Sequence, residues 1–311
     1  MSSHSGMKRW IAFACLMLAP ALHGARAAIP TEERDALIAL YTSTNGDAWV
    51  NNFNWCAGTC PSGGEPVFND PGTECTWGGI GCDGAATHVT SIVLAHNNMV
   101  GPLPPALAAL TALQVIDLDN DALTGPLPDL SGMTELSILD VHQNDIDGPM
   151  PPLSGLNNLV TVRLYGNALS GPLPALESLA NLETFLAYSN RFSGGIPSLQ
   201  GLASLQDFSV EDNQLTGTIP DLSSLVSLLA FRVGGNRLSG GVPAFPQNAV
   251  TGPPSSSLCP NMLDTTPGPN DADWDTQTGY TPWWATPYGN NLCDDIFTDA
   301  FDAAAARRTG D

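Results

Sequence analysis

Leu159-Val-Thr-Val-Arg-Leu-Tyr-Gly-Asn167-Ala-Leu-Ser-Gly-Pro-Leu-Pro174 decides the fold, because the same pattern recurs along the chain. Aligning the copies gives LxxLxLxxNxLxGxLPxLxxLxx. The copies begin at Val89, Leu113, Leu136, Leu159, Leu182, Leu205 and Leu228. The first interval is 24 residues and the other five are 23 residues each. Self-similarity at a fixed period of this length predicts a solenoid.

Three apolar positions of each unit, the first, fourth and sixth, are expected to face inward, as in Leu136, Leu139 and Val141. One coil cannot bury these side chains alone, so stacked coils must share a continuous core. The short strands around the LxL segment then form a parallel sheet with neighbours about 4.8 Å apart. The pattern therefore predicts a β-rich α/β solenoid.

The turn residues of each unit form regular columns as well. Asparagine closes the turn of every unit except the second, where Asp121 stands. Asparagine both donates and accepts hydrogen bonds, whereas an ionised aspartate cannot donate, so we predict a locally weaker turn at Asp121. The glycine column from Gly101 to Gly240 is unbroken and suits positive φ. A proline follows each of these glycines and discourages helix on the return side of the coil.

This pattern resembles the leucine-rich-repeat family, in the extracellular subclass of plant receptors and inhibitors whose units carry LxGxIP after LxxLxLxxN. The run Cys75-Thr-Trp-Gly-Gly-Ile-Gly-Cys82, preceded by a helical segment and Trp55, is similar to the N-terminal cap of that subclass. The insert around Cys56 and Cys60 departs from it. The resemblance implies a right-handed curved solenoid of seven repeats between disulfide-stapled caps. It also implies binding of partners on the concave sheet.

Residues 1–27 have the features of a secretory signal: Lys8-Arg9, an apolar run from Trp10, and Ala25-Arg-Ala27 as a cleavage site. Their removal leaves 7 of the 10 basic residues against 31 acids, a net charge of −24. Such a surface repels nucleic acid and anionic lipid. No later segment approaches the roughly 20 apolar residues that span a bilayer. We expect a secreted, periplasmic or cell-surface protein without nucleic-acid partners or membrane insertion.

Six cysteines remain beyond residue 27, and none lies in the repeats: Cys56, Cys60, Cys75, Cys82, Cys259 and Cys293. An even number in an exported chain indicates disulfides. Their location favours Cys259–Cys293, and Cys56–Cys60 with Cys75–Cys82 over the other pairings, which stay open. No histidine has zinc-site spacing with them. The run of acids at 271, 273 and 275 lacks the glycine of a calcium loop, so no metal or cofactor is expected.

The flanks of the repeats are expected to be caps, an N-terminal one over 28–88 and a C-terminal cap and tail over 251–311, with the repeats over 89–250. Thr31 is expected to cap a helix that ends near residues 44–46, and residues 47–55 are expected to form a strand. Trp49, Trp55 and Trp77 are expected to seal the end of the core, with sugar stacking as the alternative.

Functional residues are expected at the outward fifth and seventh positions of each unit, since the inward positions serve the fold. These candidates are Asp117, Asp119, Asp140, His142, Arg163, Tyr165, Leu186, Tyr188, Glu211 and Arg232. They form an acidic group on repeats two and three, followed by an aromatic and basic group. Tyrosine and arginine are enriched among interface hot spots, which favours a binding role for the second group.

These features favour a secreted, non-enzymatic recognition protein that binds a protein or peptide, with a carbohydrate- or ice-binding protein as the alternative. The chain has no GxSxG, HExxH, Walker or dinucleotide motif. The acids of the exposed face could imitate a glycosidase pair, so a polysaccharide-active enzyme is the third and weakest hypothesis.

Overall fold

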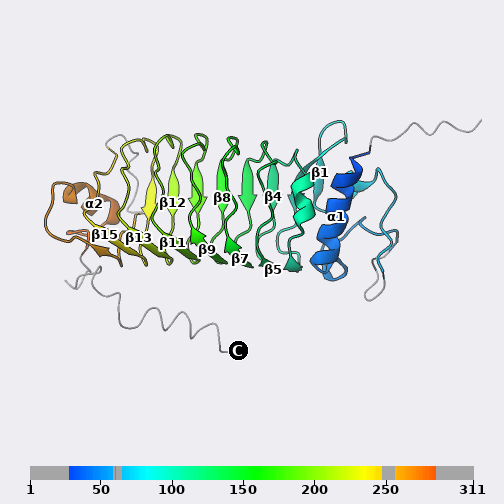
Figure 1. Cartoon of the computed structure of the whole chain (residues 1–311), viewed down its shortest axis with the longest axis horizontal. Helices are drawn as coiled ribbons and strands as arrows, with labels where there is room; N and C mark the ends of the chain where they lie inside the picture. Colours follow the sequence, from blue (N-terminus) through cyan, green and yellow to red (C-terminus); the bar gives the residue numbers. More distant parts are fainter. Residues whose placement is uncertain (1–27, 59, 61–64, 247–255, 285–311) are drawn as a thin grey trace, which may run out of the picture.

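The computed structural model describes residues 28–58, 60, 65–246 and 256–284. The expected signal segment, Cys293 and the C-terminal tail lie outside these residues. Within them the coils stack along one axis, and helices α1 (Thr31–Ser43) and α2 (Asp271–Thr278) close the two ends (Figure 1). None of the described helices is long and apolar enough to cross a membrane.

Each coil contributes one strand to each of two sheets, which the described residues build with eight strands apiece. The first sheet corresponds to the face that the resemblance makes concave. In spatial order it contains β1 (Ile80–Cys82), β2 (Val89–Val93), β4 (Val115–Asp117), β6 (Ile138–Asp140), β8 (Thr161–Arg163), β10 (Thr184–Leu186), β12 (Asp207–Ser209) and β14 (Ala230–Arg232). Its strands are parallel except for β1, which pairs antiparallel to β2.

The second sheet lies beyond the turn of each coil and is parallel throughout. It contains β3 (Val100–Pro102), β5 (Ala122–Gly125), β7 (Asp145–Pro149), β9 (Ala168–Pro172), β11 (Arg191–Gly194), β13 (Gln214–Gly217), β15 (Arg237–Gly240) and β16 (Met262–Leu263). The glycine column sits here at positive φ, for example 77° at Gly171. The return side consists of extended pieces and short turns, among them the 3₁₀ turn η3 (Pro105–Ala109), as the proline column predicts.

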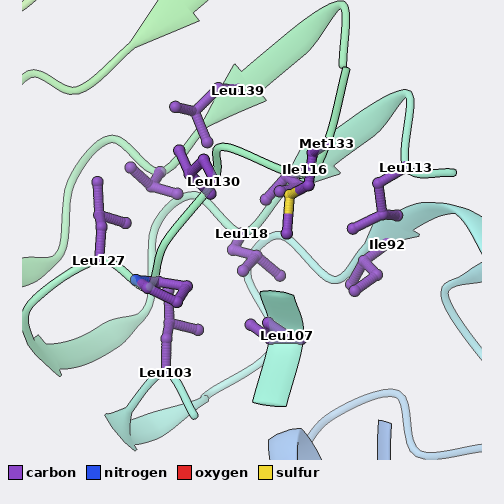
Figure 2. Close-up of a pocket in the computed structure, with 12 residues that line it drawn as sticks. Ile92, Leu103, Leu107, Leu113, Ile116, Leu118, Leu127, Leu130, Met133 and Leu139 are labelled. Carbon is purple, nitrogen blue, oxygen red and sulfur yellow. The ribbon is translucent and has the colours of Figure 1, made fainter. Parts of the chain in front are cut away.

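The core runs the length of the solenoid, and the predicted inward register is confirmed. Leu118, Leu164 and Val210 are all 0% exposed. Figure 2 shows the core of the first coils, where aliphatic side chains such as Leu118 and Leu139 surround a void of about 10 Å³. A void of this size is at the lower limit for one water molecule, and apolar voids stay dry. It is a packing gap and no ligand site.

The asparagine column ties the two sheets together. Asn167 is typical: its Oδ1 accepts from the Ile146 N–H at 3.0 Å, and its Nδ2 donates to the carbonyls of Val141 and Leu164 at 2.9 and 3.0 Å. Each such bond contributes about 1 kcal/mol net, and more is lost if a buried partner is orphaned. The column thus fixes the corner between the strands of one coil and holds the preceding coil against it.

Asp121 keeps only the accepting half of this pattern. Its Oδ1 accepts from the N–H groups of Asn97 and Met99, both at 2.9 Å. Its Oδ2 is buried without a hydrogen-bond partner among the described residues. Burial raises the pKa of this carboxyl to about 6, against the lowering effect of those N–H groups. The weaker turn expected at Asp121 stays a prediction, and it now has a physical mechanism.

The N-terminal cap is sealed by aromatic side chains. Trp49, Trp55 and Trp77 are 4%, 0% and 2% exposed, so they serve the core and offer no face to a sugar. The expected pairings Cys56–Cys60 and Cys75–Cys82 are confirmed, with Cα–Cα distances of 5.2 and 5.5 Å. Short 3₁₀ turns at Gly46–Ala48 (η1) and Glu74–Thr76 (η2) connect these parts.

Two local predictions for this cap are wrong. Thr31 is the first residue of α1, and Pro30 precedes it without a side-chain cap bond. Residues 47–55 form turns and no strand, because Asn45 and Asn54 adopt positive φ of 59° and 63°. Those turns let Trp49 and Trp55 both point inward, where their Nε1 groups donate to the carbonyls of Thr44 and Gly78.

The C-terminal cap begins with a partial coil that the repeat pattern did not reveal. Asn261 occupies the asparagine column: its Oδ1 accepts from the Leu238 N–H and its Nδ2 donates to the Val233 carbonyl, both at 2.8 Å. Helix α2 then covers the core end with Trp274, which is 0% exposed. Cys259 is disulfide-bonded, and its expected partner lies outside the described residues.

Candidate functional site

The candidate residues line one face of the first sheet, as the register requires. The fifth position ends each short strand, and the seventh follows it, so their side chains alternate with the buried fourth and sixth positions. Strands β4, β6, β8 and β10 are paired without a shift, so Asp117, Asp140, Arg163 and Leu186 stand in one row. The seventh-position residues form a second row beside it.

An acidic group with a histidine at its centre occupies repeats two and three. His142 Nδ1 lies 2.5 Å from Asp140 Oδ1, and its Nε2 lies 3.2 Å from Asp119 Oδ2. Asn120 Nδ2 approaches both Asp119 Oδ2 and His142 Nε2, at 2.5 and 3.2 Å. The side chains of His142, Asp119 and Asp140 are 13%, 12% and 7% exposed. The side chains of this group are therefore largely buried and hydrogen-bonded to one another, and they are less exposed than ordinary surface residues.

Asp117 is the member of this group whose negative charge is most disfavoured by its surroundings. Burial raises its pKa to about 6, and the hydrogen bond and negative charge of Asp119 and the charge of Asp140 add to the effect. A carboxyl beside two others titrates late because each ionisation disfavours the next. The group gathers carboxylates and imidazole, yet no set of three or more metal-ligating side chains within the described residues could hold an ion.

An aromatic ladder follows on repeats three to five, defined as His142, Tyr165 and Tyr188. The rings of His142 and Tyr165 stack with centroids 4.3 Å apart, and those of Tyr165 and Tyr188 stack at 4.4 Å with 9° between planes. The coil spacing of about 4.8 Å imposes this stacking on equivalent positions of neighbouring repeats. Beside the ladder, Arg163 Nη1 donates to Asp140 Oδ2 at 3.1 Å.

The remaining candidates lie farther along the face and are already engaged. Glu211 accepts from Ser257 Oγ at 2.5 Å and from Ser209 Oγ at 3.3 Å. Arg232 Nη1 donates to Asp207 Oδ1 at 2.8 Å. The structure thus brings seven of the candidates together around the acidic group and the ladder, with Leu186 beside them. Glu211 and Arg232 continue the face toward the C-terminal cap, and their charges still act on Tyr188.

Sequence reasoning missed Asn120, Ser209 and Ser257 as members of these networks. Ser209 occupies a fifth position and is 1% exposed. Its place in the fifth-position column was a signal of a role on this face, but its small side chain did not suggest a contact. Ser257 belongs to the partial coil, whose Leu258, Asn261 and Leu263 repeat the LxxNxL spacing. That spacing was the available signal for an additional coil.

No protein-family model matches the chain. A probable leucine-rich repeat receptor-like serine/threonine-protein kinase of Arabidopsis thaliana is 34% identical over 108 residues, which are 33% of this chain and 10% of that kinase. The receptor-like protein kinase HSL1 of the same plant is 35% identical over 56 residues, 18% of this chain and 6% of its own. The chain therefore spans about a tenth or less of these curated relatives.

Solved structures share the fold, among them the following two. The LRR ectodomain of the plant membrane receptor kinase GASSHO1/SCHENGEN3 from Arabidopsis thaliana, in complex with CASPARIAN STRIP INTEGRITY FACTOR 2, matches with a TM-score of 0.53 and 27% identity over 61% of this chain and 26% of that one. The PEPR1–AtPEP1 structure matches with a TM-score of 0.54 and 25% identity over 76% and 36%. The repeat pattern, the two-sheet solenoid and these similarities together show a leucine-rich-repeat solenoid that resembles the ectodomains of plant receptor kinases.

Proposed function

We propose that this chain is an exported, non-enzymatic recognition module that binds a protein or peptide partner on the face of the first sheet. The observation that carries the proposal is the cluster of Arg163, Tyr165 and Tyr188, held in place by ring stacking and an ion pair. Tyrosine and arginine dominate binding hot spots. A rigid solenoid presents them already ordered, which reduces the entropy lost on binding.

The similar solved structures support the same interpretation. The GASSHO1/SCHENGEN3 ectodomain and PEPR1 were each solved with a second molecule, CASPARIAN STRIP INTEGRITY FACTOR 2 and AtPEP1. Export is supported by the signal-like sequence of residues 1–27 and by the two disulfides of the N-terminal cap, since disulfides persist in oxidising compartments. We therefore place the protein in the secreted, periplasmic or cell-surface class.

A comparison of wild-type protein with the Tyr165→Ala/Tyr188→Ala variant tests this function. Immobilised protein is presented with extracellular proteins and peptides and, separately, with a glycan array. We expect a protein or peptide ligand that no longer binds the variant. The control Val226→Ala changes an exposed residue of the return side and should retain binding. Equal binding by wild type and by Tyr165→Ala/Tyr188→Ala would contradict the assignment to this face. Loss confined to glycans would favour the carbohydrate-binding alternative.

A second candidate function, binding of an extended solid surface such as ice, has its own observation in its favour. The outward position before each glycine of the second sheet carries a hydroxyl in most coils. These residues are Thr124, Ser170, Ser193, Thr216 and Ser239, interrupted by Val100 and Asp147. A regular row of this kind is absent from the first sheet. Thermal hysteresis that Thr216→Val reduces and Tyr165→Ala leaves intact would support this candidate.

A further inference from the structure

The carboxylates along the middle of the first sheet already have donors within the protein. Asp140 accepts from Arg163 and contacts His142, Glu211 accepts from two serine hydroxyls, and Asp207 accepts from Arg232. A partner that brought only hydrogen-bond donors to this stretch would compete for carboxylates that are already engaged.

The unused polar groups of this region are donors. A guanidinium carries five N–H groups, and Arg163 makes one hydrogen bond to the described residues, to Asp140, while 43% of its side chain stays exposed. Burial raises the pKa of the Tyr165 and Tyr188 phenols. Both hydroxyls therefore keep their protons at physiological pH. The Tyr165 hydroxyl donates to that of Tyr188, so the Tyr188 proton is the one that a partner can accept.

The stacking geometry decides how the aromatic ladder can be used. Tyr165 has His142 against one ring face and Tyr188 against the other, at 4.3 and 4.4 Å. Its π faces are thus covered, and what it offers to a partner is its ring edge and hydroxyl. The edge of an aromatic ring is the positive part of its quadrupole. Such a surface suits carbonyl and carboxylate oxygens, whereas a sugar that stacks on a ring needs an open face.

We propose that Arg163, Tyr165, Leu186 and Tyr188 bind an extended peptide through its hydrogen-bond acceptors. This inference rests on the proposed function and deepens it. An acidic side chain of the peptide pairs with the free N–H groups of Arg163, and a peptide carbonyl accepts from the Tyr188 hydroxyl. An apolar side chain packs on the half-buried Leu186. Strands about 4.8 Å apart and a peptide rise of about 3.3 Å per residue place the acidic and apolar residues one or two positions apart.

The test selects random dodecapeptides by phage display on the purified chain and measures the affinity of the enriched peptides by fluorescence anisotropy. We expect Asp or Glu one or two positions away from an aliphatic residue. Arg163→Gln should weaken binding about tenfold or more, since hydrogen bonds between charged groups contribute about 1.5–3 kcal/mol. Tyr165→Phe/Tyr188→Phe keeps the stack and should weaken binding about fivefold or more. Ser239→Ala, on the second sheet, should bind as wild type.

A double-mutant cycle locates the acidic residue. Replacing the peptide's Asp or Glu by its amide should weaken binding to wild type about tenfold and have little further effect on Arg163→Gln, because partners in one contact are not additive. Arg163→Lys provides a second variant that keeps a cation beside Asp140, and it should also bind more weakly because it loses the planar fork.

The possible failures are distinguishable. Two outcomes would overturn this inference and leave the proposed function standing. In both, the enriched peptides lose binding to Tyr165→Ala/Tyr188→Ala. In the first the peptides are basic, and in the second they bind Tyr165→Phe/Tyr188→Phe as tightly as wild type. Selection of no peptide that depends on those tyrosines would overturn both.

Discussion

The two sheets are built from the same coils and share one core, yet they use their outward positions differently. On the first sheet, the outward rows contain aspartate, histidine, arginine and tyrosine, and several of these side chains are buried in mutual contacts, with Asp140 5% exposed. On the second sheet, the outward position before each glycine is mostly a small hydroxyl residue, and its contacts are long, such as Thr216 Oγ1 to the Gly194 carbonyl at 3.4 Å.

This difference separates what specifies the fold from what is free to specify a ligand. The glycine at positive φ and the following proline constrain the second sheet, because few residues suit those backbone positions. The fifth and seventh positions of the first sheet carry no such requirement, so varied chemistry accumulates there. Four predictions test the comparison, beginning with the contact that both sheets need.

Asn167→Ala should have the largest effect on stability, because this side chain joins the two sheets. Its loss orphans the buried Ile146 N–H and removes donors from two carbonyls. The N–H left unsatisfied costs about 1–3 kcal/mol and each of the two other hydrogen bonds contributes about 1 kcal/mol, so we expect a loss of about 3–5 kcal/mol in urea unfolding. Asn158→Ala, an exposed residue that donates to the Thr134 carbonyl, is the control and should change stability by less than about 1 kcal/mol. Similar losses in both variants would contradict the special role of the column.

Asp121→Asn should stabilise the protein at neutral pH. The folded-state pKa of Asp121 is raised to about 6 from 3.8, so the folded protein holds this proton more tightly than the unfolded chain does. The stability of the folded protein therefore falls as the pH rises from 3.8 to about 6. After allowance for solvent screening of a partly exposed group, we expect a gain of about 1–2 kcal/mol at about pH 7.5 and much less at about pH 4.

The matched control for this substitution has the opposite sign. Hydrogen bonds from the Ser131 backbone and hydroxyl lower the pKa of the exposed Asp129, so its charge stabilises the fold above the unfolded pKa and this contribution is lost as pH falls. Asp129→Asn should lower the melting temperature at neutral pH and have no effect in acid. If Asp121→Asn melted no higher than wild type at neutral pH, the weak turn at Asp121 would be disproved.

Much of the fold could be predicted because one periodic signal repeats over seven coils. The inward positions, the asparagine corner and the glycine column each depend on a residue type at a fixed offset, and Leu164, Asn167 and Gly171 behave as that offset requires. Where the signal is not repeated, prediction failed. The segment 47–55 has strand-like composition, but positive φ at Asn54 and inward packing of Trp55 override that preference.

The candidate site was predictable as a set of outward positions, but not as a network. The sequence places His142 and Tyr165 on the same row, and the coil spacing then brings their rings to stacking distance. It does not reveal that Asn120 reaches both Asp119 and His142, because that contact depends on side-chain rotamers. Nor does it reveal that Ser257 approaches Glu211, because the partial coil lies beyond the regular period.

Tyr165→Leu should have a smaller effect than the two buried-turn substitutions. The leucine keeps apolar bulk in the row but removes the ring between His142 and Tyr188, and each aromatic pair contributes about 0.5–1.5 kcal/mol beyond its buried area. We expect a loss of about 1 kcal/mol in urea unfolding. The control Tyr280→Leu, a 39% exposed residue of the C-terminal cap, should cost less. No difference between the two would mean that the ring stacking of the ladder contributes nothing to the free energy of unfolding.

Thr216→Val should have the smallest effect, because the outward side of the second sheet is not part of a network. The hydroxyl makes one long contact to the Gly194 carbonyl and is exposed, so its removal forfeits little hydrogen-bond energy, and valine preserves the β-branched shape that suits a strand. We expect a change within about 0.5 kcal/mol in urea unfolding and unaltered peptide binding. A larger loss would mean that the hydroxyl row of the second sheet supports the coil stack. The contrast between an engaged first sheet and an independent second sheet would then fail.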